Sequence, residues 1–162
     1  MTEKILIAYY SRSGNTEKTA KMIHQEMGGK RHRIIPETPY PKSYDATVDQ
    51  AKQEIKHGTQ PPLINQLDSV AGYHLIFIGS PNWWSTIAPP VSTFLTSYDF
   101  AGKTLALFCT HGGGGLGRMA SDIAKLCPKS NLLSPFTVYG SGGRGVNVDL
   151  AAWLNEIKTS LS

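Results

Sequence analysis

The stretch that decides the fold is KILIAYYSRSGNT, residues 4–16. Its first half is a short apolar run of residues that favour strands. A cluster of turn-forming residues, SRSGN, follows, and after it Ala20, Ile23 and Met27 recur at helical spacing. The segment therefore predicts a buried strand that passes through a tight polar turn into an amphipathic helix.

The same alternation of strand and helix continues along the chain. Further strands are expected at residues 31–35, 73–80, 103–110 and 132–140, the last an edge strand because it contains a proline. Helices are expected at 43–57, 89–98, 119–126 and 150–161. Apolar strands separated by amphipathic helices predict an α/β fold. We expect a doubly wound, five-stranded parallel sheet of order 2-1-3-4-5, with helices on both faces.

Length and composition favour one globular domain over residues 1–162, because 40% of the 162 residues are hydrophobic and 17% are charged. No apolar stretch approaches the roughly 20 residues that cross a bilayer, and the N-terminal apolar run is too short for a secretory signal. Cys109 and Cys127 have no disulfide or metal spacing. These features predict a cytoplasmic protein with reduced cysteines and no metal.

The chain is basic, with a net charge of +4. Its densest basic cluster is Lys30, Arg31, His32 and Arg33, without interleaved aromatic residues or a recognition-helix pattern, so nucleic-acid binding is not expected. In the predicted sheet this cluster lies on an edge strand, where charge discourages edge-to-edge pairing. A docking patch for an anionic partner is the alternative.

In a doubly wound sheet the ligand lies outside the carboxyl ends of the strands, where loops 11–16, 79–90 and 110–117 converge. The first loop joins a strand to a helix N-terminus, which favours an anion. Its residues add neutral donors and a flexible backbone, and a phosphate monoester fits them. The neutral donors are Ser11, Ser13, Asn15 and Thr16, and Gly14 lets the backbone come close. The G-K-[ST] ending of a nucleoside-triphosphate loop is absent. Arg12 either contacts the phosphate or points to solvent.

The second loop contains two adjacent tryptophans, Trp83 and Trp84, after Pro81 and Asn82. Each tryptophan carries roughly 150–250 Å² of surface that favours burial. Packing into the core explains one of them, and a flat aromatic ligand would explain the other.

The third loop is THGGGGLGR, residues 110–118, in which Gly112, Gly114 and Gly117 fit the dinucleotide spacing G-x-G-x-x-G. That motif requires an acidic residue about 20 positions later, and residues 128–148 contain no Asp or Glu. The run also follows the fourth predicted strand rather than the first. We interpret the match as accidental, and the glycines as bare backbone that can lie against something flat.

Three motifs, YYSRSGNT, GSPNWW and GK-x5-CTHGGGG, together resemble the flavodoxin-like family, nearest to a branch with a two-tryptophan loop and a T-H-G-G stretch. The resemblance covers nearly the whole chain, with the loops in the family's order. It implies that FMN is the cofactor and that residues 11–16 hold its phosphate. It also implies that two segments flank the isoalloxazine ring. These are Pro81, Asn82, Trp83 and Trp84, and Thr110, His111, Gly112, Gly113, Gly114 and Gly115.

The sequence departs from that family in two respects. Where many electron-carrying flavodoxins place a tyrosine against the ring, the third loop has only His111 and glycines. His111 either donates to a ring oxygen or is held by the backbone. Flavodoxins are also usually acidic, to dock basic partners, whereas this chain is basic.

Three functions follow from these features. The first is electron transfer through a bound flavin, to a redox partner protein or a small-molecule acceptor. The second is an NAD(P)H-dependent FMN oxidoreductase of quinones or similar flat acceptors, and the third is a non-catalytic flavin-binding module. The flavin itself carries the chemistry, so no catalytic side chain is expected. A hydrolase triad lacks its G-x-S-x-G elbow, and the strand ends lack the acidic residues of a phospho-receiver domain.

The three loops contain no Asp or Glu. One carboxylate about 8 Å from a flavin, at an effective dielectric near 20, interacts with it by about 2 kcal/mol, or roughly 90 mV for one electron. The sequence therefore predicts a final reduction potential higher than that of acidic flavodoxins.

Overall fold

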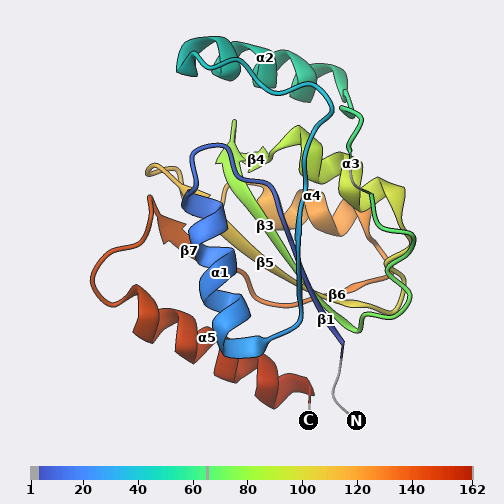
Figure 1. Cartoon of the computed structure of the whole chain (residues 1–162), viewed down its shortest axis with the longest axis vertical. Coiled ribbons are helices and arrows are strands. Elements are labelled where there is room, and N and C mark those ends of the chain that lie inside the picture. Colours follow the sequence, from blue (N-terminus) through green and yellow to red (C-terminus); the bar gives the residue numbers. More distant parts are fainter. Residues whose placement is uncertain (1–3, 65, 162) are drawn as a thin grey trace.

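A computed structural model describes residues 4–64 and 66–161. At its centre is a parallel sheet with the order β2-β1-β3-β5-β6 (Figure 1). These strands are β1 (Ile5–Tyr9), β2 (Lys30–Arg33), β3 (Leu75–Trp83), β5 (Thr104–His111) and β6 (Asn131–Leu132). The doubly wound α/β arrangement expected from the sequence is therefore present, with β2 at one edge.

The expected number of five strands is wrong, because the described residues contain seven. A two-residue strand, β4 (Thr86–Ile87), pairs antiparallel with the end of β3. The strand expected over 132–140 is broken into β6 and β7 (Phe136–Tyr139), and both pair with β5. Pro135 lies in the gap, and a proline has no N–H to donate to a ladder. The simple order 2-1-3-4-5 thus becomes β2-β1-β3-β5-β6, with β4 and β7 as additions.

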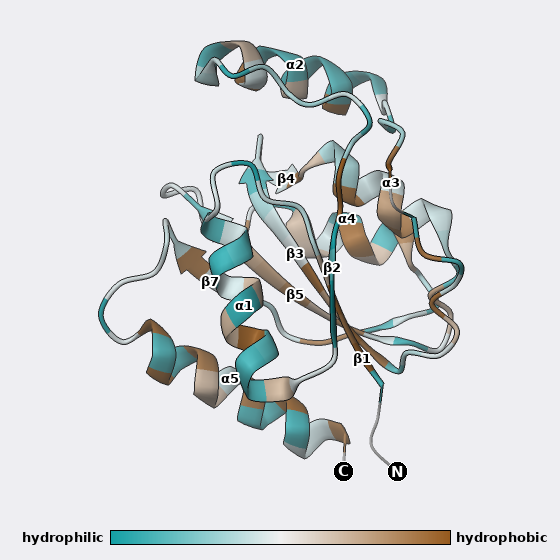
Figure 2. Ribbon diagram, viewed as in Figure 1, coloured by the Kyte–Doolittle hydropathy of each residue, from teal (hydrophilic) through white to brown (hydrophobic). Residues whose placement is uncertain are grey.

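Four helices cover the two faces of the sheet. On one face, α1 (Asn15–Met27) and α5 (Val146–Leu161) pack through Ile23 and Trp153 against Phe77 and its neighbours. On the other face, α3 (Pro89–Ser97) and α4 (Met119–Leu126) close a second apolar cluster. The hydropathy colours show that β1 and β5 are hydrophobic, as strands buried on both sides must be (Figure 2). No helix of the described residues is long and apolar enough for a membrane span.

The remaining helix, α2 (Tyr44–His57), does not lie on the sheet. It sits beyond the carboxyl ends of the strands, apart from the two layers of helices (Figure 1). Its limits agree with the prediction: the Ser43 side chain accepts a hydrogen bond from the Ala46 N–H at 3.3 Å, and Gly58 ends it at φ 64°. Of its residues only Thr47 and Ala51 are buried, and neither belongs to the two core clusters.

Close packing fixes β1, β3 and β5 against one another near the site. Tyr9 is opposite Gly79, and Gly79 is opposite Phe108, in three adjacent strands. A Cβ on Gly79 would lie 2.3 Å from the Phe108 ring and 2.9 Å from the Tyr9 Cβ, so only glycine fits there. β1 ends at this level, whereas β3 and β5 continue to Trp83 and His111, so the segments that follow β1 lie beside the last residues of its neighbours.

Candidate functional site

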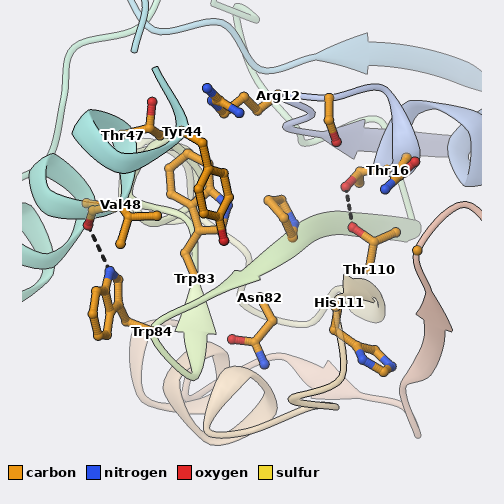
Figure 3. A pocket seen from close by; sticks show the side chains of 16 residues that line it. Arg12, Thr16, Tyr44, Thr47, Val48, Asn82, Trp83, Trp84, Thr110 and His111 are labelled. Carbon is orange, nitrogen blue, oxygen red and sulfur yellow. Dashed lines mark hydrogen bonds between the residues drawn. The ribbon is translucent and has the colours of Figure 1, made fainter. Parts of the chain in front are cut away.

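A pocket of about 510 Å³ opens at the carboxyl ends of β1, β3 and β5, beneath α2 (Figure 3). All three predicted segments reach it, but two of them are not loops throughout: residues 79–83 belong to β3, and Thr110 and His111 end β5. Its lining consists of Arg12, Ser13, Asn15, Thr16, Tyr44, Thr47, Val48, Ala51, Pro81, Asn82, Trp83, Trp84, Thr110, His111, Gly112 and Gly140. Most of the predicted site residues are in this lining, and those outside it are Ser11, Gly14, Gly113, Gly114 and Gly115.

The first loop presents the N-terminus of α1 to the pocket. Gly14 occupies the cap position at φ 100°, and its N–H donates to the Ser11 Oγ at 3.1 Å. Within the described part of the chain, no side chain caps the first turn of α1. The end of this helix thus faces the pocket without a protein acceptor, which is the arrangement that binds anions.

Two buried threonines join this loop to the third loop. The Thr16 and Thr110 hydroxyl oxygens are 2.7 Å apart, so one donates to the other between α1 and β5 (Figure 3). This hydrogen bond fixes the first turn of α1 relative to the end of β5.

Arg12 lines the pocket and does not simply point to solvent. Its Nη2 donates to the backbone oxygens of Pro41 and Lys42, at 3.3 and 3.1 Å. Both acceptors precede α2, so Arg12 ties the first loop to the segment that carries this helix.

The two tryptophans have different surroundings. Trp83 meets Tyr10 and Tyr40 edge-on, with ring centroids 5.4 and 5.0 Å away. Trp84 is 45% exposed and donates from Nε1 to the Val48 oxygen at 2.9 Å, which links the loop to α2 (Figure 3). Trp83 is therefore held by other rings, whereas Trp84 is held by α2.

The turn between β3 and β4 has an unusual backbone. Trp84 and Ser85 have φ values of 56° and 66°, as in the tight turns that favour Asn-Gly. Such conformations cost of order 1–3 kcal/mol for residues other than glycine, and the surrounding structure must hold them. The Arg118 N–H supports the turn by donating to the Ser85 oxygen at 2.6 Å.

In the third loop, the His111 Nδ1 accepts a hydrogen bond from the Gly113 N–H at 3.0 Å. A neutral imidazole with Nδ1 as acceptor carries its proton on Nε2, which leaves that nitrogen as the donor. The backbone contact expected for His111 is therefore present, and donation to a ligand remains open to it. Asn82 fixes the same loop, because its Nδ2 donates to the Gly115 oxygen at 2.7 Å.

Comparison with known proteins now decides the family. The model of the family described as flavodoxin matches residues 4–157. The chain belongs to the flavodoxin family. No curated protein sequence matches it.

Solved structures agree with this family. A candidate flavoprotein from Bacteroides eggerthii is 27% identical, with a TM-score of 0.83 over 96% of this chain and 98% of that one. A flavoprotein in complex with FMN from Lactobacillus acidophilus is also 27% identical, with a TM-score of 0.71 over 91% and 97%. Oxidised flavodoxin 1 from Bacillus cereus is 18% identical, with a TM-score of 0.65 over 99% and 100%, and it shares the fold.

Sequence reasoning missed one wall of the pocket of this flavodoxin. That wall is Tyr44, Thr47, Val48 and Ala51 of α2. Gly140 after β7 was missed as well, and it lies on the His111 side of the pocket, where its N–H donates to the His111 oxygen at 2.8 Å. The amphipathic pattern of α2 identified its inner face but not the surface that this face meets. Gly140 had a usable signal, because it follows a parallel strand at the same edge of the sheet.

The electrostatics of the pocket favour an anionic ligand. No Asp or Glu occurs among the described residues that line it, and Arg12 brings a positive charge. Burial raises the pKa of Tyr10 to about 12. Burial and a hydrogen bond to Glu54 raise that of Tyr40. Both phenols beside Trp83 therefore stay neutral. No group of metal-binding side chains occurs in the described residues.

Proposed function

We propose that this flavodoxin binds FMN and acts as a redox protein through it. The observation that carries the proposal is the pocket itself, which joins an uncapped helix N-terminus to two tryptophans and a glycine loop. The helix N-terminus would bind the phosphate of FMN, and the tryptophans and the glycine loop would fit its flat ring. The FMN complex of the Lactobacillus acidophilus relative supports the choice of cofactor.

Each part of the pocket has a role in this proposal. Ser13, Asn15 and Thr16, with the first-turn amides of α1, would hold the phosphate. Trp83 and the bare backbone near Gly112 would lie along the ring. His111 would donate from Nε2 to a ring oxygen, since its Nδ1 already accepts from Gly113.

When bound, FMN would supply the electron transfer, and the protein would position it and set its potential. Trp84 and α2 would exclude water from one side of the pocket. A redox partner protein or a small-molecule acceptor would take up the electrons.

The identity of the cofactor is tested by titrating the apo-protein with FMN and with riboflavin. Binding is measured by the quenching of flavin fluorescence. We expect FMN to bind much more tightly than riboflavin, because only FMN carries the phosphate. A protein that is purified without colour and binds neither flavin would refute the proposal.

A second candidate is an NAD(P)H-dependent oxidoreductase of quinones or similar flat acceptors. One observation favours it: Gly112 lines the pocket as exposed bare backbone, and the nearest aromatic ring to His111, that of Tyr139, meets it edge-on at 5.6 Å from the end of β7 instead of from the third loop.

Anaerobic mixing with NADPH separates the candidates. Rapid bleaching of the FMN-loaded protein without a reductase identifies the enzyme, whereas bleaching only with a separate reductase identifies the electron carrier. Resistance to both would indicate a flavin-binding module without turnover.

A further inference from the structure

The edge strand β2 sends one side chain to the first loop. Arg33 is paired with Tyr9 in the sheet, at the end of β1. Its Nη2 donates to the backbone oxygen of Ser11 at 3.1 Å, and its Nη1 lies 2.6 Å from the Glu17 Oε2. Arg33 therefore contacts both the loop and the helix that follows it.

Glu17 is a carboxylate in the first turn of α1. A negative charge there stabilises the helix, because it faces the positive end of the helix dipole. The same charge would repel a phosphate bound at that helix end. Glu17 is, however, surrounded by groups that offset its charge: Arg33, the Lys21 Nζ at 3.5 Å and the Tyr9 hydroxyl at 3.3 Å.

We propose that Arg33 is a positioning residue for the phosphate subsite, which fixes the Ser11 carbonyl and neutralises Glu17. The proposal rests on the proposed binding of FMN. Arg33 thereby permits a carboxylate that stabilises α1 to stand beside an anion.

This role differs from that of a general charge on an edge strand. Arg31 lies on the same side of β2, two residues earlier, and is paired with Ile7 rather than with the last residue of β1. If charge on the edge were the whole explanation, Arg31 and Arg33 would be equivalent. The geometry instead gives Arg33 alone the contact with Ser11.

The first test compares Arg33→Gln with the matched control Arg31→Gln. Arg33→Gln should weaken FMN binding about tenfold, because the Ser11 carbonyl loses its anchor and Glu17 loses its counter-charge beside the phosphate. Riboflavin, which has no phosphate, should bind within about twofold of the wild type. Arg31→Gln should leave both affinities unchanged. Equal loss of FMN and riboflavin would overturn the proposal, since it would mean a general structural effect.

The second test adds Glu17→Gln to Arg33→Gln. If Glu17 repels the phosphate once Arg33 is gone, the double variant should recover part of the lost FMN affinity. Thermal unfolding of each apo-variant shows whether the fold is kept. A double variant that binds FMN no better than Arg33→Gln would contradict the neutralising role.

Inorganic phosphate separates this inference from the proposed function. It is titrated into ¹⁵N-labelled apo-protein, and the Gly14 amide resonance is followed. A phosphate-dependent shift that Arg33→Gln weakens, in a protein that binds no FMN, would refute the flavin function and keep the subsite. If phosphate shifts no resonance in the first loop, the subsite itself is refuted.

Discussion

At Gly14 a side chain would strain the backbone but would not clash with any neighbouring atom. The φ of Gly14 is 100°, and a Cβ built there meets nothing within 4 Å. Gly14→Val should therefore reduce stability by about 1 to 3 kcal/mol, the cost of holding a residue other than glycine at such a φ. FMN affinity should fall on the order of a hundredfold, the equivalent of about two charge-assisted hydrogen bonds.

The chain offers a matched control for this change. Gly102 has φ 76° and equally open space around its Cβ, but it precedes β5 at the opposite end of the sheet. Gly102→Val should lose similar stability and keep its FMN affinity. Urea unfolding and flavin titration of both variants measure the two effects. Equal loss of FMN affinity in the two variants would mean that strain alone is responsible.

His32 makes the stability depend on pH. It is buried on β2 with its ring 5.7 Å from that of Phe94, and burial lowers its pKa below the ordinary value of 6.5. The unfolded chain then binds the proton more tightly than the folded one, so stability falls as the pH drops below about 6.5.

The measurement is the urea midpoint between about pH 7.5 and about pH 5, a range that brackets this titration. His32→Leu should flatten the decline, because it removes the buried imidazole. His57→Leu, at an exposed position on α2, should leave the decline in place. A decline that persists unchanged in His32→Leu would show that other groups cause it.

Among the elements, the β3–β4 turn has the clearest mechanical role, because its Trp84 holds α2 over the pocket. Trp84→Phe removes the hydrogen bond from Nε1 to Val48 and keeps an aromatic ring. We expect amide hydrogens of α2 to exchange about tenfold faster, while those of β3 are unchanged. Trp153→Phe is the comparison: it removes a hydrogen bond to the Ser134 oxygen and some core packing on the far side of the fold, so it should speed exchange in α5 and leave α2 no faster than the rest of the chain. Unchanged exchange in α2 would mean that other contacts hold it.

The type and order of the helices and main strands followed from local sequence, since apolar spacing and capping residues such as Ser43 are local signals. Some limits were wrong: β3 extends to Trp83 instead of residue 80, and α5 begins at Val146 instead of residue 150. The β4 hairpin did not, because the signal for such a turn is a residue pair like Asn-Gly, and here Trp84-Ser85 adopts it. The break at Pro135 was partly foreseen, since the proline predicted an edge strand but not two separate pieces.

The candidate site was predictable to the extent that it follows from the strand order. Parallel strands end at one edge, so the three loops had to converge there. The position of α2 was not predictable, because its apolar residues fit equally well on a sheet face or over a pocket. Local sequence also gave no sign that Arg33 reaches Ser11, since that contact depends on the pairing of β2 with β1.

At the scale of the whole molecule, the distribution of charge sets an expectation for the reduction potential. Because no carboxylate occurs among the described lining residues, we expect the final potential of bound FMN to exceed that of acidic flavodoxins. Val48→Asp, on the pocket side of α2, should lower it by on the order of 90 mV for a charge about 8 Å away. Val48→Asn is the neutral control. Redox titration of the wild type and the two variants measures the final reduction potential. Equal potentials for the Asp and Asn variants would contradict the expected effect of the added charge.

The position of α2 has a consequence for how this protein could change over evolutionary time. The helix contributes no residue to either core cluster, yet it supplies one wall of the pocket. Mutations in α2 could therefore alter which ligands the pocket binds, while the sheet and the other helices of the described residues keep their packing. An engineer could exchange the same segment between relatives to transfer ligand preference without redesigning the core.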